Sequence, residues 1–191
     1  MLQAINIDSY ITRNTDEYMG LLTRTSLINN MKCNLSVSIH CNASEDPEPN
    51  YIATYIQATG GEAEKLAQAV QNQMVKLIKW KDGGVKTANL ALTRDTNMPA
   101  ILCECGFISN PEQEQLLNDP NIQKGIAIAI VNGIINYAGL KEEVKSEMNL
   151  DQAIAILKEK GIISNSDYWK MAAQCVRYLD NLIISVANYI K

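Results

Sequence analysis

Pro99-Ala100-Ile101-Leu102-Cys103-Glu104-Cys105-Gly106-Phe107-Ile108-Ser109-Asn110-Pro111-Glu112 is the stretch that decides the fold, because it sets one acid inside an apolar run. Residues 101–105 have no polar side in their alternation, which predicts a short strand buried on both faces. A buried acid is costly unless it is paired, protonated or close to a metal ion. Glu104 comes just before Gly106 ends the strand, where ligand chemistry gathers in open α/β sheets. Glu104 is therefore a candidate catalytic residue.

The composition is that of a globular protein, and its 191 residues are enough for one core and a small appendage. The net charge of −4 argues against a nucleic-acid partner. No apolar run has the length of a membrane span, and no basic segment with an apolar stretch follows Met1, so we expect neither a membrane segment nor a signal peptide. The five cysteines lie mostly in apolar stretches, which favours buried reduced thiols over disulfides.

Strands and helices alternate along most of the chain. Strands are expected over residues 5–13, 35–41, 51–57, 88–93 and 99–106, and helices over a segment capped by Thr15 and over 62–81, 112–117 and 122–137. The two glycine pairs, 60–61 and 83–84, are interpreted as turns. This order predicts an α/β fold with a mostly parallel sheet flanked by helices.

The last quarter of the chain differs from the rest. The polar run 141–147 is interpreted as a linker between a domain at 1–140 and a helical module at 148–191. In that module we expect a helical hairpin, with one helix capped by Asn149 and ended by Gly161, and a longer helix capped by Ser166. Apolar residues step by four and three from residue 168 to 186, which indicates either packing within the module or a homodimer contact through the helix 167–191.

His40 is the only histidine of the chain, and it ends the strand 35–41 on its polar side. A lone histidine is by default a hydrogen-bonded structural residue. However, His40 and Glu104 are expected at the ends of neighbouring strands. Together they are suited to one half of a metal-dependent hydrolase site, in which one side chain binds the metal and the other moves the proton of the water. A serine nucleophile fits poorly, because no G-x-S-x-G segment is present. A cysteine hydrolase using Cys41 or Cys103 stays open, although Cys41 and His40 point to opposite faces of their strand.

Several ordered motifs now identify a family. Residues 36–43 (Ser-Val-Ser-Ile-His-Cys-Asn-Ala) resemble the S-I-H-x-N-A strand end of zinc-dependent N-acetylmuramoyl-L-alanine amidases of the amidase-3 type, the autolysins and phage endolysins that cut peptidoglycan. Residues 99–110 resemble the second signature of that family, P-A-x-L-x-E-x-G-F-x-S-N. Further matches lie at Thr12-Arg13, Arg24, 83–89 and Leu92-Thr93-Arg94, so the resemblance spans residues 5–138.

The resemblance implies a fold, a reaction and a set of site residues. His40 would be a zinc ligand, and Glu104 the carboxylate that moves the proton of a zinc-activated water while the amide between N-acetylmuramic acid and L-alanine is hydrolysed. Asn42, Asn89 and Arg94 would position the substrate. The expected partner is peptidoglycan, and the expected place of action is the bacterial cell wall.

The chain also departs from the family pattern. The family has two more zinc ligands upstream, a histidine in a G-H-G segment after its first strand and a glutamate on the next helix. This chain begins after both. We therefore expect either a missing N-terminal segment or a degenerate homologue, and in both cases an incomplete zinc site and a sheet that is short of its first strand, with an unpaired edge. The alternative function is a non-catalytic cell-wall-binding or assembly protein derived from such an amidase.

Overall fold

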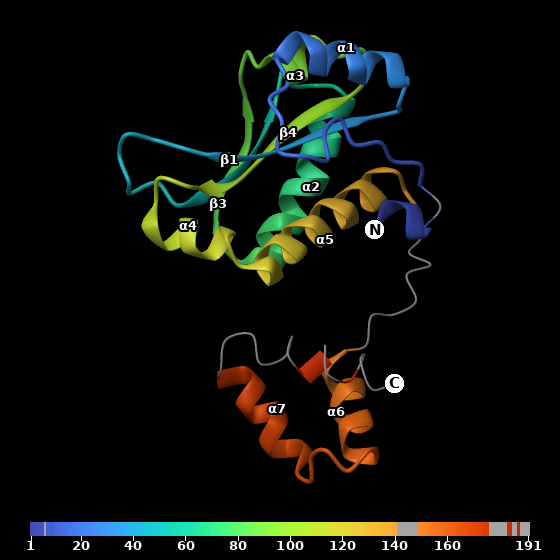
Figure 1. Cartoon of the computed structure of the whole chain (residues 1–191), viewed down its shortest axis with the longest axis vertical. Helices are drawn as coiled ribbons and strands as arrows, with labels where there is room; N and C mark the ends of the chain where they lie inside the picture. The colour runs from blue at the N-terminus through green and yellow to red at the C-terminus, as the bar shows by residue number, and fades with distance from the viewer. Residues whose placement is uncertain (6, 141–148, 176–182, 185–186, 188–191) are drawn as a thin grey trace. The chain divides into compact units, whose positions relative to one another are not determined.

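A computed structural model describes residues 1–5, 7–140, 149–175, 183–184 and 187 of the chain (Figure 1). The chain forms two compact units, Met1–Glu142 and Glu143–Lys191. The described residues of the first unit form a 3-10 helix, Leu2–Ile5, and four strands, β1 (Ser36–Asn42), β2 (Tyr51–Ile56), β3 (Lys81–Thr87) and β4 (Ala100–Phe107). They also form five α-helices, α1 (Leu21–Met31), α2 (Glu62–Ile78), α3 (Ala91–Arg94), α4 (Pro111–Leu117) and α5 (Pro120–Tyr137). The described helices of the second unit include α6 (Leu150–Glu159) and α7 (Ser166–Cys175).

The four strands form one sheet in the order β1-β4-β2-β3. The outer pairs, β1 with β4 and β2 with β3, are parallel, whereas β4 and β2 are antiparallel. The predicted α/β fold with a mostly parallel sheet is therefore confirmed. Strand β4 is an inner strand, and every one of its residues is buried except Glu104, which is partly exposed. The apolar run around Glu104 thus forms the buried strand that its lack of a polar side predicts.

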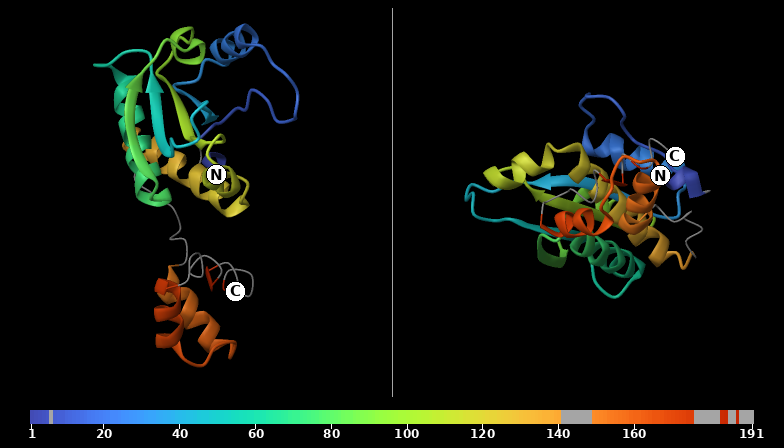
Figure 2. Two further views of the ribbon diagram at one scale, coloured as in Figure 1. Left: turned by 90° about the vertical axis from the view of Figure 1, so that its left-hand side faces the viewer. Right: turned by 90° about the horizontal axis from the view of Figure 1, so that it is seen from below.

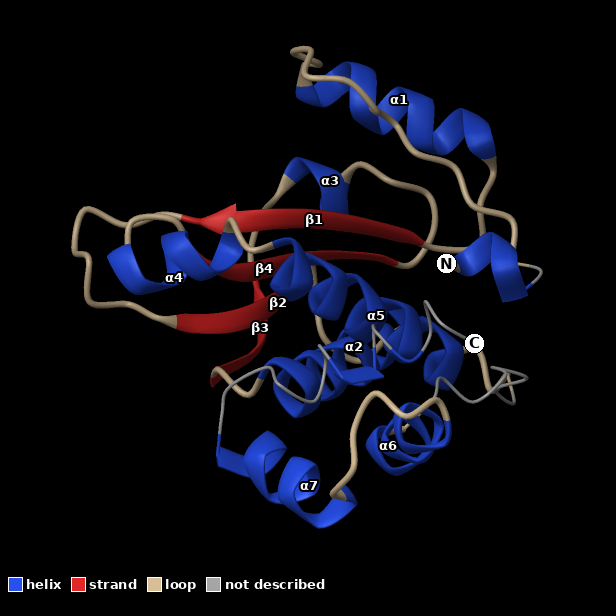
Figure 3. Ribbon diagram, turned by 60° about the horizontal axis from the view of Figure 1, so that its bottom comes forward, coloured by secondary structure: helices blue, strands red, loops and turns tan. Residues whose placement is uncertain are grey.

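Helices cover both faces of this sheet. Figures 2 and 3 show α2 and α5 on one side of the strands and α1 and α3 on the other. On the first face Gln71 of α2 accepts a 2.8 Å hydrogen bond from the hydroxyl of Thr54 in β2. On the second face an apolar cluster joins α1, α3 and β4 through Ile28, Leu92 and Leu102. Each face of the sheet therefore has its own helical layer.

The N-terminal segment differs from its prediction. The strand expected over residues 5–13 is wrong: residues 2–5 form a 3-10 helix, and described residues 7–13 join no strand ladder. An alternating segment becomes a strand only when a neighbour accepts its backbone hydrogen bonds, and a short alternation does not supply that neighbour. The cap predicted at Thr15 is also wrong, because α1 begins at Leu21 after Gly20 and no side chain caps it.

Strand β3 corrects a second prediction. Gly83 and Gly84 lie inside β3 rather than in a turn, and the strand expected over 88–93 is instead the short helix α3 with the residues before it. Gly84 has φ +75°, and its N–H donates to the carboxylate of Asp82 over 2.8 Å. A Cβ on Gly83 would overlap the ring of Tyr51. The glycine pair therefore lets β3 shift register while it passes close to β2.

The second unit contains two described helices with local capping. Asn149 caps α6 and forms a capping box with Gln152, as predicted for this position. Ser166 is the first residue of α7, and the cap is one residue earlier, where the side chain of Asn165 accepts the N–H of Tyr168 over 3.0 Å. The buried core of the second unit contains Ala153, Ile154, Leu157, Ile163, Ile183 and Ala187.

Some predictions fall on positions outside the described residues. These are the linker 141–147 and the seam positions Leu179, Leu182 and Val186. The division into a catalytic domain at 1–140 and a helical module at 148–191 stays a prediction. Within the described part of the chain, no helix combines the length and the apolar character needed to cross a bilayer.

Candidate active site

His40 and Glu104 lie opposite each other on neighbouring strands. Their Cα atoms are partners in the parallel ladder between β1 and β4. Side chains of partnered residues leave a sheet on the same face, and adjacent strands are about 4.8 Å apart. That face is the one covered by α1 and α3, because Leu102, two residues before Glu104, belongs to their apolar cluster. The structure therefore brings the two predicted residues to one rim of the sheet.

A glycine stands near the end of β4, just after Glu104, for a steric reason. Gly106 has φ +135°, a region that side chains rarely adopt, and a Cβ there would come within 2.8 Å of the Trp80 ring. The register between β1 and β4 also shifts between His40 and Asn42. Bulges of this kind are common beside active sites, where they redirect side chains. The G-F pair of the signature thus has a structural role at the end of the strand that carries Glu104.

Glu104 has the electrostatics of a proton-transfer group. Burial raises its pKa from the ordinary value of 4.5 to about 7. Its Oε2 atom is buried and accepts a hydrogen bond from none of the described residues. Buried carboxylate oxygens normally have partners, so such an atom is typical of a functional site. Near neutral pH this carboxyl can both take up and release a proton.

His40 is held in its neutral form. Burial lowers its pKa, and the nearby positive charge of Arg24 lowers it further. Arg24 is fixed in α1 by a 2.7 Å hydrogen bond from its Nε atom to the carbonyl of Met19. A neutral imidazole keeps one nitrogen lone pair, which a metal ion or a donor hydrogen can use. Arg24 is therefore a site residue whose electrostatic effect on His40 the sequence did not reveal.

The three other predicted site residues divide into two groups. Asn42 follows His40 closely, at the end of β1, and its carbonyl accepts the N–H of Ile108 over 2.8 Å. Asn89 and Arg94 lie together near α3, joined by a 2.9 Å hydrogen bond from Nη1 of Arg94. The guanidinium also pairs with Asp95 at 2.7 Å. Only Asn42 is thus brought to the strand ends that carry His40 and Glu104, and the substrate-positioning role of all three stays a prediction.

Gln113 is a further residue of this rim that the sequence reading missed. Its buried side chain accepts the N–H of Phe107 over 2.8 Å and donates to the carbonyl of Asn50 over 3.0 Å. It thus joins the end of β4 to the loop that leads from His40 to β2. The available signal was the Asn110-Pro111 helix start, because the side chain of Asn110 accepts the N–H of Gln113.

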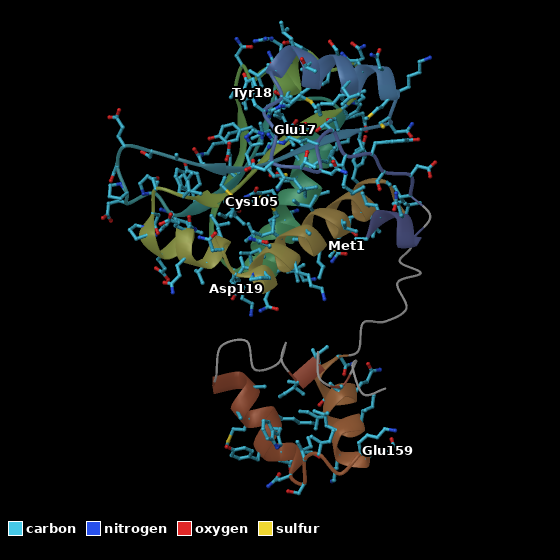
Figure 4. All side chains as sticks on the ribbon, viewed as in Figure 1. Met1, Glu17, Tyr18, Cys105, Asp119 and Glu159 are labelled. Atoms are coloured by element: carbon cyan, nitrogen blue, oxygen red, sulfur yellow. The ribbon has the colours of Figure 1, made fainter. Side chains whose placement is uncertain are left out.

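The thiols of Cys41, Cys103 and Cys105 all have raised pKa values. Cys103 is fully buried, and burial raises its pKa to about 12, so its thiol is not ionised near neutral pH. Burial also raises the pKa of Cys105, labelled in Figure 4. Cys41 is exposed, but burial of its sulfur and the charge of Glu104 raise its pKa as well. None of the three thiols has the lowered pKa of a cysteine nucleophile.

Comparison with known proteins identifies the family. The family model described as N-acetylmuramoyl-L-alanine amidase matches residues 1–136, which is most of the chain. The chain belongs to the amidase-3 family. It is similar to the endolysin of Bacillus phage SPP1, with 30% identity over 137 residues that cover 70% of this chain and 51% of the phage protein. The chain thus spans about half the length of that curated relative.

Solved structures of amidases resemble the first unit. The N-acetylmuramoyl-L-alanine amidase of Clostridium difficile 630 is 36% identical, with a TM-score of 0.67 over 71% of this chain and 74% of that protein. The catalytic domain of CwlV from Bacillus (Paenibacillus) polymyxa var. colistinus is 30% identical, with a TM-score of 0.69 over 73% and 78% of the two chains. The sheet with helices on both faces is thus an amidase fold.

The amidase-3 family is generally zinc-dependent. A catalytic zinc site uses three protein ligands and leaves one position for water or substrate. Among the residues that the structure describes, no three His, Cys, Asp or Glu side chains are arranged to hold a metal ion. His40 and Glu104 supply at most two donors. The described residues alone therefore do not fit a catalytic zinc ion, and no reaction step is derived through one.

Proposed function

We propose that the amidase fold of this chain hydrolyses the amide between the lactyl group of N-acetylmuramic acid and L-alanine in peptidoglycan. The observation that carries the proposal is the pairing of His40 with Glu104 across β1 and β4, together with the unpartnered Oε2 of Glu104. The amidase names of the relatives support this choice of bond. The place of action would be the bacterial cell wall, where this substrate is found.

Glu104 performs the proton transfers in this proposal. Its ionised form takes a proton from a water molecule as the water oxygen attacks the carbonyl carbon. The protonated carboxyl then gives that proton to the departing amine nitrogen as the carbon–nitrogen bond breaks. A pKa of about 7 suits both transfers, because the two forms of the carboxyl are close in free energy at neutral pH.

His40 lies beside Glu104 as a neutral imidazole, and among the described residues it is the side chain that we assign as a ligand to the zinc ion of the family. We assign Asn42, at the same strand end, to hold the sugar–peptide link by hydrogen bonds. Asn89 and Arg94 take a more distant part of the substrate, and Arg94 must share its guanidinium with Asp95 to do so.

The alternative is a protein that binds cell-wall peptide without cutting it. One observation favours it, namely that the described residues provide no cluster of three metal ligands. Zinc content of the purified chain separates the two functions. One zinc ion per chain supports the amidase, whereas binding of muropeptides with no zinc and no cleavage supports the alternative.

We assign the second unit a role in homodimer formation rather than in the hydrolysis. Helix α7, Ser166–Cys175, carries the first positions of the apolar spacing that predicts a homodimer contact through residues 167–191. Light scattering of the whole chain tests this contact. A monomer that persists at high protein concentration contradicts it.

Product analysis tests the proposed reaction. Purified peptidoglycan is incubated with the chain in zinc-containing buffer, and newly exposed amino termini are identified by mass spectrometry. The proposal predicts peptides that begin with L-alanine and glycan strands that stay intact. Glu104→Gln keeps the size of the side chain but removes its proton transfer, and it should lose the activity by at least about 100-fold. Equal release of L-alanine termini by wild type and Glu104→Gln contradicts the assignment.

A further inference from the structure

Lys86 lies on the same face of the sheet as the His40–Glu104 pair. Its Cα partner in the parallel ladder with β2 is Tyr55, and Tyr55 in turn is partnered with Leu102 of β4. Leu102 and Tyr55 both belong to the apolar cluster under α1 and α3, which defines the face. Two neighbouring rows of side chains therefore cross this face. Leu102, Tyr55 and Lys86 lie in one row, and His40, Glu104 and Ala53 lie in the other, two residues away along the strands.

In the middle of these rows lie one small residue and two aromatic residues of β2. Ala53 is the Cα partner of Glu104, and it lies between Tyr51 and Tyr55 along β2. The side chain of Ala53 is only a methyl group, so it projects less from the sheet than the two tyrosines on either side, directly beside the Glu104 carboxyl. The pKa of Tyr55 is raised by burial, and the charges of both Lys86 and Glu104 act on it, which agrees with their common face.

The ammonium of Lys86 is held in a defined position. Its Nζ atom lies 4.2 Å from the centroid of the Tyr51 ring, which is cation–π geometry. The ring itself is fixed by an edge-to-face contact with Phe107, with centroids 4.8 Å apart. Three ion pairs occur among the described residues, and Lys86 takes part in none of them. The cation is therefore oriented by a ring while it lacks a carboxylate partner within the described part of the chain.

The spacing between Lys86 and Glu104 suits an acidic peptide. Strands β4 and β3 are separated by two strand spacings, about 10 Å, and Lys86 lies two residues, about 7 Å, along the strands from the row of Glu104, so the two Cα atoms are about 12 Å apart. In an extended peptide about 7 Å separates the nitrogen of one residue from the α-carboxylate of the next, because consecutive Cα atoms are about 3.8 Å apart. A hydrogen bond of about 2.8 Å at each end extends the reach to about 12 Å. A peptide nitrogen near Glu104 can thus have the carboxylate of the following residue at Lys86.

We infer that Lys86, oriented by Tyr51, binds the free carboxylate of the acidic residue that follows L-alanine in the stem peptide. The inference rests on the proposed function, since it takes the scissile amide to lie at His40 and Glu104. Lys86 then determines specificity: it selects stem peptides with a free carboxylate at that residue against those in which the group is a carboxamide. A carboxamide lacks the charge and leaves the ammonium with a weaker acceptor.

A binding experiment tests this role without relying on cleavage. The full chain carrying Glu104→Gln is titrated by calorimetry with two muramoyl peptides that differ only in a free or an amidated α-carboxyl at the second residue. The Glu104→Gln chain, in which Lys86 is intact, should bind the peptide with the free carboxyl about five to ten times more tightly than the amidated peptide. Adding Lys86→Met should remove that preference, whereas Lys86→Arg, which keeps the charge, should retain most of it.

The control variant is Lys76→Met. It makes the same change of charge on an exposed residue of α2, on the other side of the sheet, and should keep the full preference. Equal affinity of the Lys86 chain for the two peptides, a preference that survives Lys86→Met, or no binding of either peptide would overturn the inference. If wild type fails to cleave peptidoglycan while the binding preference depends on Lys86, the proposed reaction fails and the carboxylate site stands.

Discussion

His40 and Glu104 are Cα partners at the ends of two parallel strands, and this pairing joins the two signatures of the chain. His40 and Glu104 lie more than sixty residues apart in sequence, yet the sheet brings them to one face. Glu104 is also the single partly exposed residue of β4. The strand is therefore buried everywhere except at the carboxyl to which we assign the proton transfer.

The pH dependence of stability should reveal the buried carboxyl. The pKa of Glu104 is raised from 4.5 to about 7 in the folded chain, so the folded state holds this proton more tightly than the unfolded state. Between these two pH values the unfolded chain is ionised at Glu104 while the folded chain stays protonated. The free energy of unfolding should therefore fall as the pH rises from about 4.5 to 7. Urea unfolding of wild type should show this fall, and Glu104→Gln should show less of it.

Gln113 should be important for stability as a bridge between two segments. Gln113→Leu leaves the buried N–H of Phe107 and the carbonyl of Asn50 without their partner, which should lower the free energy of unfolding by about 2 kcal/mol. Gln115→Ala, an exposed change in the same helix, should cost less than about 0.5 kcal/mol. Urea unfolding at one fixed pH compares the two variants. Equal stability of both would show that the bridge contributes nothing.

Gly106 should tolerate no side chain. Its φ of +135° and the nearby Trp80 ring predict that Gly106→Ala lowers the free energy of unfolding by more than about 2 kcal/mol. Gly61→Ala is the matched control, because nothing lies within 4 Å of the added Cβ and its backbone is extended. A thermal unfolding scan gives the comparison. Similar midpoints for the two variants would contradict the strain assigned to the end of β4.

The thiols should react in the order of their exposure. Cys41 is exposed, whereas Cys103 and Cys105 are buried and hold their protons at neutral pH. Treatment of the folded chain with N-ethylmaleimide, followed by peptide mass spectrometry, should label Cys41 well before the other two. Labelling of Cys103 at the rate of Cys41 would show that β4 opens far more readily than its burial implies. Full labelling in urea serves as the positive control.

Sequence reasoning reached the centre of the site but not its surroundings. Strand β4 and Glu104 were predictable because a buried strand has no polar side, and His40 because it ends an alternating strand. The strand expected over 5–13 failed because pairing depends on a neighbour that local alternation does not reveal. Gly83 and Gly84 were read as a turn, although here they serve a register shift in β3.

The role of Lys86 depends on two contacts that are distant in sequence. Its position over Tyr51, and the contact of that ring with Phe107, arise only when β3, β2 and β4 assemble. A lysine in a polar stretch carries no such signal by itself. The effect of Arg24 on His40 is similar, since it depends on how α1 packs over the sheet.

Titration of the Glu104 carboxyl carbon by NMR tests the central claim most directly. The whole chain is labelled with carbon-13 glutamate, and Glu104→Gln identifies the signal by its loss. A midpoint about 7 is the predicted result, because burial without a hydrogen-bond partner raises this pKa. A midpoint near the ordinary 4.5 would show a well-solvated or paired carboxylate, and it would contradict the proton transfer assigned to Glu104.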